Sequence, residues 1–252
     1  MDPLARMRAD LARFLQWVAA AEDASRLLEL PGVTGAIVPA ARGRSVFNSL
    51  AYEDAGALEA ALPDIAAAYD DAGIEAWTVW VPPGDERAPE LLARAAHVLD
   101  AEPLAMVCDL DGWDQPAVGD LDWTEDPGSL ADVMAINDTA YDHEGSPFTD
   151  AFQALADGGH VYIARLEGRP ASGLVTFEHD SSAGIYWVAT LPEARGRGLA
   201  WRLLGQALAD ARDRGCTVST LEATKMGAPV YERLGYRSCG SIQMWERRRP
   251  TG

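Results

Sequence analysis

The stretch TLPEARGRGLAWRLL, residues 190–204, places two glycines and two arginines between a strand-like segment and a helical one. Gly196 and Gly198 carry no Cβ, so successive backbone N–H groups can converge on an anion where the strand turns into the helix. Arg195 and Arg197 add positive charge, and a helix start has unpaired N–H groups and the positive end of the macrodipole. The stretch therefore predicts a pyrophosphate-binding loop, with a tight turn and solvated arginines as the alternative.

The spacing around the loop excludes two other nucleotide motifs. A Walker loop requires G-x-x-x-x-G-K-[ST], which the chain does not contain. A dinucleotide fingerprint requires a third glycine at the position of Trp201. What remains is R-x-x-G-x-A over residues 195–200, preceded by IYWVATLP and followed at a distance by PVYERLGY.

Composition limits the class of protein. The chain has 252 residues, 48% of them hydrophobic, and a formal net charge of -18. The hydrophobic content is typical of globular proteins, and the negative charge argues against nucleic acid or an anionic membrane as the main partner. Lys225 is the single lysine among 21 basic residues, and with abundant alanine, glycine and arginine this indicates a GC-rich, bacterial genome.

Cysteine, histidine and the N-terminus give no sign of a metal or an export signal. The three cysteines form no CxxC pair, and the four histidines lack ligand spacing, so no metal site is expected. The N-terminus lacks a cationic head followed by an apolar run, and no stretch of about 18 apolar residues exists. We expect a cytoplasmic protein.

Periodicity predicts a mixed α/β chain. An amphipathic helix opens it, and strands are expected within GVTGAIVPA and RSVFNSLAYED. The further elements expected in the first half are a helix (56–72), a strand (74–81), a helix (86–98) and a strand (103–110). Those expected in the second half are a strand (121–124), helices (129–141 and 149–156), strands (160–166, 170–179 and 183–190), a helix (196–214), a strand (216–222), a short helix (227–234) and a last strand (236–246).

The two halves repeat the same order of elements. The segment from AAAYDDAGIEAW to AMVCDL can be laid over ALADARDRGCTV to QMWERR, with Gly73 on Gly215 and Leu91 on Val230. The Asp-, Gly- and Pro-rich segment 111–120 is the expected linker. We therefore expect domains at 1–110 and 121–252, each a mixed, mostly antiparallel sheet flanked by helices, with chance periodicity as the alternative to a duplication.

With these motifs, residues 121–246 resemble the GCN5-related N-acetyltransferase (GNAT) family, whose pyrophosphate signature is [RQ]-x-x-G-x-[GA] and whose late helix often reads L-Y-E-x-L-G-F. Residues 1–110 resemble a degenerate second copy without the cofactor loop, as in tandem members of the family. The resemblance implies acetyl-CoA as acyl donor and no metal. It places the cofactor-binding set at Val188, Ala189, Thr190, Arg195, Gly196, Arg197, Gly198, Leu199, Ala200 and Trp201.

The resemblance also suggests catalytic residues. Acyl transfer needs a neutral amine and a proton for the leaving thiolate, and Tyr231 matches the family's proton-donating tyrosine. The family often uses a glutamate on the fourth strand as base, but AGIYWVAT has no carboxylate. Glu222 is the first candidate, with Glu178, Asp142 and Glu144 as alternatives.

The sequence thus predicts acetyl transfer from acetyl-CoA to a primary amine of a small molecule or peptide, by a monomer or homodimer. A non-catalytic acyl-CoA-binding or regulatory protein is the alternative. Both predict CoA binding; they differ in whether free thiol is released.

Overall fold

The computed structural model describes residues 3–141 and 158–249. Among these, the chain forms two compact units, the first made of residues 3–105 and 239–249 and the second of residues 106–141 and 158–238. Each unit is a mixed sheet flanked by helices, as expected from the sequence. The expected helix at 149–156 lies outside the described residues.

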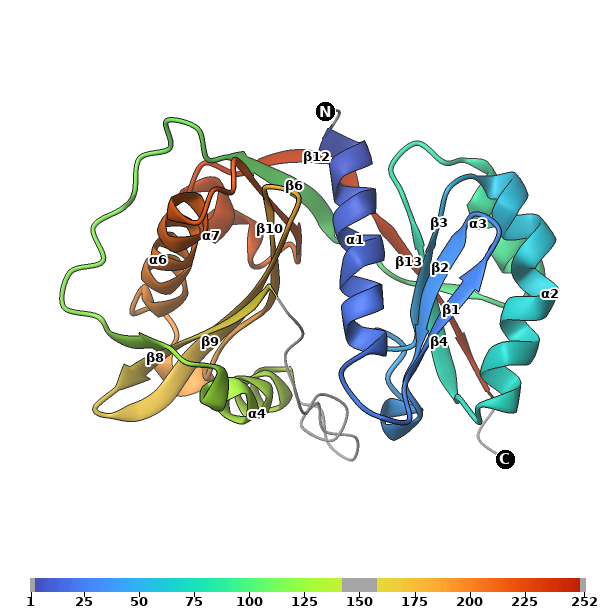
Figure 1. Cartoon of the computed structure of the whole chain (residues 1–252), viewed down its shortest axis with the longest axis horizontal. Coiled ribbons are helices and arrows are strands. Elements are labelled where there is room, and N and C mark those ends of the chain that lie inside the picture. Colours follow the sequence, from blue (N-terminus) through green and yellow to red (C-terminus); the bar gives the residue numbers. More distant parts are fainter. Residues whose placement is uncertain (1–2, 142–157, 250–252) are drawn as a thin grey trace. The chain divides into compact units, whose positions relative to one another are not determined.

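The first unit contains three α-helices and six strands among the described residues. In chain order they are α1 (Pro3–Ala19), β1 (Arg26–Leu30), β2 (Val33–Ile37), β3 (Ser49–Tyr52), α2 (Ala55–Asp71), β4 (Ala76–Val81), α3 (Arg87–Arg94), β5 (Val98–Ala101) and β13 (Gln243–Arg248). The strand order is β1-β2-β3-β4-β13-β5. Helix α1 covers one face of this sheet and α2 and α3 cover the other (Figure 1).

The second unit is built around the sheet β12-β6-β11-β10-β9-β8-β7. Its elements are β6 (Leu104–Asp109), β7 (Asp122–Glu125), α4 (Leu130–Ala140), β8 (Gly159–Leu166), β9 (Arg169–His179), β10 (Ser182–Thr190), α6 (Leu199–Asp213), β11 (Val218–Ala223), α7 (Ala228–Glu232) and β12 (Arg237–Ser241). Helices α4 and α6 lie on opposite faces of the sheet (Figure 1).

The two sheets share a pairing pattern. In the first, β1–β2 and β2–β3 are antiparallel and β3–β4 is parallel. In the second, β8–β9 and β9–β10 are antiparallel and β10–β11 is parallel. The loop that precedes α6 therefore occupies the same position in its unit as the β3–α2 loop does in the first.

Each half of the sequence ends in a strand that belongs to the sheet of the other half. Strand β6 follows the elements of the first unit but lies between β11 and β12, and β13 follows the second unit but lies between β4 and β5. The single expected strand at 236–246 is therefore two strands, because Ile242 separates β12 from β13 and the two belong to different sheets. This arrangement differs from the expected division at 111–120, since each sheet takes an internal strand from the other half of the sequence.

The expected linker packs against the second unit. Residues 111–120 contain no helix or strand, yet the Trp113 indole donates to the Leu234 carbonyl at 2.7 Å. A Cβ on Gly205 of α6 would lie 2.5 Å from Pro116, so the segment touches the helix directly. Strands β1 and β5 were not expected, since short segments at sheet edges carry little periodicity.

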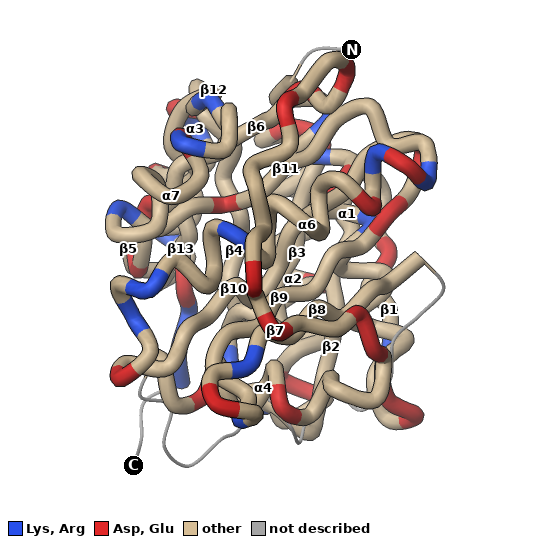
Figure 2. Tube along the Cα trace, turned by 90° about the vertical axis from the view of Figure 1, so that its left-hand side faces the viewer, with Lys and Arg blue, Asp and Glu red and all other residues tan. Residues whose placement is uncertain are grey.

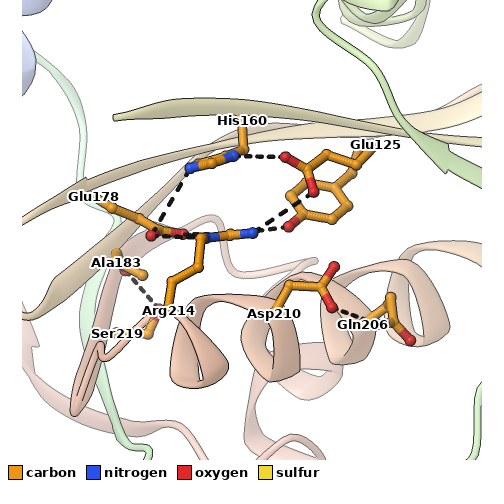
Figure 3. A network of polar contacts seen from close by, with 9 residues as sticks. Glu125, His160, Glu178, Ala183, Gln206, Asp210, Arg214 and Ser219 are labelled. Atoms are coloured by element: carbon orange, nitrogen blue, oxygen red, sulfur yellow. Dashed lines mark hydrogen bonds and ion pairs between the residues drawn. The ribbon is translucent and has the colours of Figure 1, made fainter. Parts of the chain in front are cut away.

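An ionic network anchors the C-terminal end of α6 (Figure 3). Arg214 donates to both oxygens of Glu178 on β9, at 2.5–3.1 Å, and to the Tyr162 hydroxyl on β8 at 3.0 Å. His160 lies 2.6 Å from Glu125 on β7. The network ties the end of α6 to three strands, which fixes the direction of the helix whose other end forms the glycine-arginine loop.

A buried histidine makes the first unit sensitive to acid. His97 is 3% exposed, its ring nitrogens bond to no described residue, and its ring edge meets Trp77 at 4.4 Å between centroids. Burial, with repulsion from Arg247, lowers the pKa of His97 to about 4. Its native form is therefore neutral.

We predict that the free energy of unfolding falls as the pH drops from neutral toward 4, because the unfolded chain binds the His97 proton near pH 6.5 and the folded chain resists it. The loss is about 2 kcal/mol between pH 7 and pH 5. Denaturant titrations of the parent and of His97→Leu measure it. A His97→Leu protein with the same pH dependence as the parent contradicts the assignment.

Candidate functional site

A cavity of about 340 Å³ in the second unit brings most of the predicted cofactor residues together. The residues lining it come from the end of α4, the end of β10, the glycine-arginine loop with the start of α6, and the segment from β11 into α7. They are Ala140, Tyr141, Val188, Ala189, Thr190, Ala194, Arg195, Gly196, Gly198, Leu199, Ala200, Trp201, Thr224, Met226, Gly227, Val230, Tyr231 and Arg233.

The two glycines of the loop have left-handed backbones. Gly196 has φ +77° and Gly198 has φ +72°, and a Cβ on either would meet no atom within 4 Å. Helix α6 begins at Leu199, with Gly198 as its N-cap and no side chain capping it. The first N–H groups of α6 thus remain available at the cavity, in the arrangement that suits an anion.

Strand β10 offers an open backbone edge at the same cavity. Its parallel pairing with β11 covers only the three pairs from Ser182–Val218 to Gly184–Thr220. Beyond these pairs both chains continue along the cavity, β10 with residues 188–190 and the segment after β11 with Thr224 and Met226. Over residues 188–190 strand β10 has no register partner on β11, so an extended ligand could lie along this edge.

The two arginines of the loop have different environments. Arg195 lines the cavity and donates to the carbonyls of Thr190 at 3.3 Å and Ala140 at 3.1 Å, so it joins the end of β10 to the end of α4. Arg197 is exposed and does not line the cavity. The sequence prediction grouped both as phosphate ligands, whereas the geometry gives Arg195 a bracing contact.

Tyr231 lies at the inner wall of the cavity. Its residue is 9% exposed, its ring packs edge-on against Tyr236 at 6.0 Å, and its hydroxyl bonds to no described residue. Burial, with a smaller contribution from Tyr141, raises the pKa of Tyr231 well above its ordinary value. The phenol is therefore protonated throughout the neutral range, the form that donates a proton or a hydrogen bond.

The predicted bases lie elsewhere. No carboxylate lines the cavity among the residues that the structure describes. Glu222 is on β11, one residue before Ala223 and outside the lining, and Glu178 belongs to the Arg214 network. Asp142 and Glu144 lie outside the described residues.

The sequence interpretation missed several cavity residues, notably Tyr141, Met226 and Arg233. The Tyr141 hydroxyl reaches the Val188 carbonyl at 3.4 Å, and the Arg233 guanidinium stacks over the Trp201 ring at 5.1 Å. Tyr141 and Met226 are 44% and 73% exposed, unusual for large apolar side chains. No spacing rule links these residues, because they converge only when α4, α6 and α7 pack on the sheet.

The comparisons with known proteins give a domain match that covers most of the second unit. Residues 157–238 match the family model of the acetyltransferase (GNAT) domain. The matched segment contains the loop, the open edge of β10 and Tyr231. No curated protein sequence matches the chain significantly.

Solved GNAT structures share the fold over nearly the whole chain. A GCN5-related N-acetyltransferase from Kribbella flavida is 18% identical, with a TM-score of 0.72 over 98% of this chain and 96% of that one. One from Sphaerobacter thermophilus is 14% identical, with a TM-score of 0.58 over 97% and 95%. A tandem GNAT protein from the clavulanic acid biosynthesis pathway is 12% identical, with a TM-score of 0.55 over 98% and 96%.

The described residues have neither a concentrated basic segment nor a metal-binding cluster. Figure 2 shows Lys and Arg positions interspersed with Asp and Glu along the chain rather than gathered in one segment. No group of three or more His, Cys, Asp or Glu side chains in the described part of the chain is arranged to hold a metal ion. No helix among residues 3–141 and 158–249 is long and apolar enough to cross a bilayer.

We predict that Gly198→Val weakens CoA binding by about tenfold or more, because the branched side chain disfavours the left-handed backbone and projects into the anion site. Calorimetric titration with CoA measures the effect. Gly168→Val is the matched control: Gly168 has φ +75° and open space at its Cβ position, but lies in the β8–β9 turn. Equal CoA affinity in folded Gly198→Val and parent proteins would refute the site.

Proposed function

We propose that the chain is an acyl-CoA-dependent N-acetyltransferase that moves the acetyl group of acetyl-CoA to a primary amine. One observation carries the proposal: an uncapped helix start, an open strand edge and a buried tyrosine surround one cavity. The match of residues 157–238 to the GNAT domain supports the same reading.

The cavity suits the parts of acetyl-CoA in order. The pyrophosphate would bind the N–H groups at the start of α6, next to Gly196 and Gly198. The pantetheine amides would pair with the edge of β10 at residues 188–190, which has no register partner on β11, as a peptide adds to a sheet edge. The thioester would then lie toward Tyr231, where β10 and β11 diverge.

The reaction needs one bond made and one broken. The amine nitrogen attacks the thioester carbonyl carbon, the C–S bond breaks, and the leaving sulfur receives a proton. Tyr231 is the proposed donor, since its raised pKa keeps the hydroxyl protonated. The phenol would pass this proton to the sulfur as negative charge develops there. The proton lost by the amine leaves through water, with Glu222 on β11, two residues before the lining residue Thr224, as the candidate base.

The first unit is proposed to be a degenerate copy that binds no CoA. Its sheet repeats the pairing pattern of the second, and Gly73 and Gly215, aligned in the repeat, both have left-handed backbones. Helix α2, which corresponds to α6, is capped by Asp54, whose carboxylate accepts from Gly56 N–H at 2.8 Å and Ala57 N–H at 3.0 Å. These two donors lower the pKa of Asp54, so a fixed negative charge occupies the place of the phosphate.

A non-catalytic acyl-CoA sensor is the second candidate, because the cavity contains no described carboxylate that could act as base. Incubating the protein with acetyl-CoA and a broad panel of amines, while following free CoA thiol, separates the two. A saturable, amine-dependent release of thiol supports the transferase. Tight CoA binding without turnover over the panel supports the sensor.

We predict that Tyr231→Phe lowers the single-turnover rate of acetyl transfer by about 10² to 10⁴-fold, while acetyl-CoA affinity stays nearly unchanged. The substitution removes one hydroxyl and keeps the ring that packs on Tyr236. Tyr236→Phe is the control, since its hydroxyl bonds to Ser219 at 2.7 Å in the core and does not line the cavity. A folded Tyr231→Phe protein that matches the parent's rate across pH shows that the phenol only packs.

We predict a stoichiometry of one CoA per chain, because Asp54 fills the helix start that would bind a second pyrophosphate. Calorimetry on the full chain gives the number directly. Gly198→Val should remove the single binding event and leave no residual site. A stoichiometry of two, or a residual site in that variant, would overturn the degenerate-copy proposal.

A further inference from the structure

One residue of β10 has a backbone conformation that is unusual in a strand. Trp187 has φ +54°, whereas the other described non-glycine residues with positive φ all lie in turns. The pairing with β9 passes from Tyr186–Val175 to Ala189–Gly173, so Trp187 and Val188 lie opposite the single residue Leu174. This is a β-bulge, and the left-handed conformation is strained for a residue with a bulky side chain.

A buried amide on α4 stabilises this conformation. Asn137 is 1% exposed, and its side-chain nitrogen donates to the Trp187 carbonyl at 2.7 Å and to the Val133 carbonyl at 3.0 Å. The first bond crosses from α4 to the bulge. The bond gives the Trp187 carbonyl, beside the irregularity in the ladder, a fixed partner on α4.

The helix can reach the bulge because the strand beneath it carries glycine. A Cβ on Gly173 of β9 would lie 2.7 Å from the Val133 side chain, so α4 sits directly on the sheet. Gly173 also pairs with Ala189, at the end of the bulge. Val133 and Asn137 are one helical turn apart, so the close contact at Gly173 sets the position of the Asn137 amide.

We infer that Asn137 is a positioning residue for acetyl transfer: it holds the bulge so that the backbone of Val188 faces the acyl group of acetyl-CoA. The inference rests on the proposed function. Val188 lines the cavity and has no register partner on β9. Its carbonyl accepts from the Tyr141 hydroxyl at 3.4 Å, so its N–H is the main-chain group proposed to meet the ligand. A backbone N–H that is already in position can stabilise the negative charge that develops on the thioester oxygen, because the protein need not reorganise during the reaction.

The test compares the parent with Asn137→Leu, which keeps the branched shape of the side chain and removes the donor. Thr139→Ala is the matched control, because the Thr139 hydroxyl donates to the Ala135 carbonyl at 3.0 Å on the same helix but does not reach β10. Trp187→Gly, alone and with Asn137→Leu, supplies the rescue, since glycine adopts a positive φ without strain. Asn137→Ala replaces Asn137→Leu if the latter does not fold.

Three measurements are made on each full-length protein. Backbone chemical shifts from NMR report whether residue 187 is left-handed without ligand. Calorimetry gives the affinities for CoA and acetyl-CoA. Single-turnover acetyl transfer to hydroxylamine, a small probe amine, gives the rate.

We expect that residue 187 in Asn137→Leu no longer shows the chemical shifts of a left-handed backbone. The rate should fall by about tenfold to hundredfold, while acetyl-CoA affinity changes by less than about threefold. In the Trp187→Gly background, Asn137→Leu should change the rate by less than about threefold, because glycine holds the bulge unaided. Thr139→Ala should match the parent in all three measurements.

Two outcomes overturn the inference alone. One is a parent that binds and transfers while Asn137→Leu keeps its rate. The other is an Asn137→Leu protein that loses CoA and acetyl-CoA affinity in proportion to its rate, which would make Asn137 a general support of the fold. A parent that binds no acetyl-CoA overturns the proposed function as well, and the chemical shifts then still show whether Asn137 holds the bulge.

Discussion

The exchange of β6 and β13 is the constraint on which the rest of the structure depends. Each is an internal strand, β6 between β11 and β12 and β13 between β4 and β5. An internal strand satisfies backbone groups on two neighbours, so its removal would leave two rows of donors and acceptors without partners. Neither half of the sequence therefore contains a complete sheet, and the two units fold from one continuous chain that crosses between them twice.

Within the second unit, the two ends of α6 have opposite requirements. The C-terminal end is held by a dense ionic network that joins Arg214 to Glu178 and Tyr162. The N-terminal end has no capping side chain and begins at a glycine. In the proposed function this helix start binds an anion and therefore has to remain uncapped, so the stability of the helix comes from its apolar face and from its other end.

The start of α2, which corresponds to α6 in the first unit, is capped by a side chain. Asp54 supplies the carboxylate that caps α2, and Asp85 does the same for α3, accepting from Arg87 and Ala88 N–H. Side-chain capping typically contributes about 1 kcal/mol, and it fills the anion site. In the proposed assignment the first unit has exchanged cofactor binding for local stability, while the second retains a strained bulge at Trp187 and an open helix start at Gly198.

The sequence by itself determined the local elements and the glycine-arginine turn before α6. Apolar spacing predicted α1, α2 and α6, and the placement of Gly196 and Gly198 before an apolar helix predicted an anion-binding turn, because these depend on contacts within a few residues. Tyr231 followed from its neighbours in the chain by resemblance, and the cavity places it beside the loop. Only the tertiary structure decided which sheet β6 and β13 join, that Arg195 braces α4 against β10, and that Asn137 meets Trp187 across 50 positions of sequence. A one-dimensional pattern reports which face of an element is buried; which partner buries it depends on packing between distant segments.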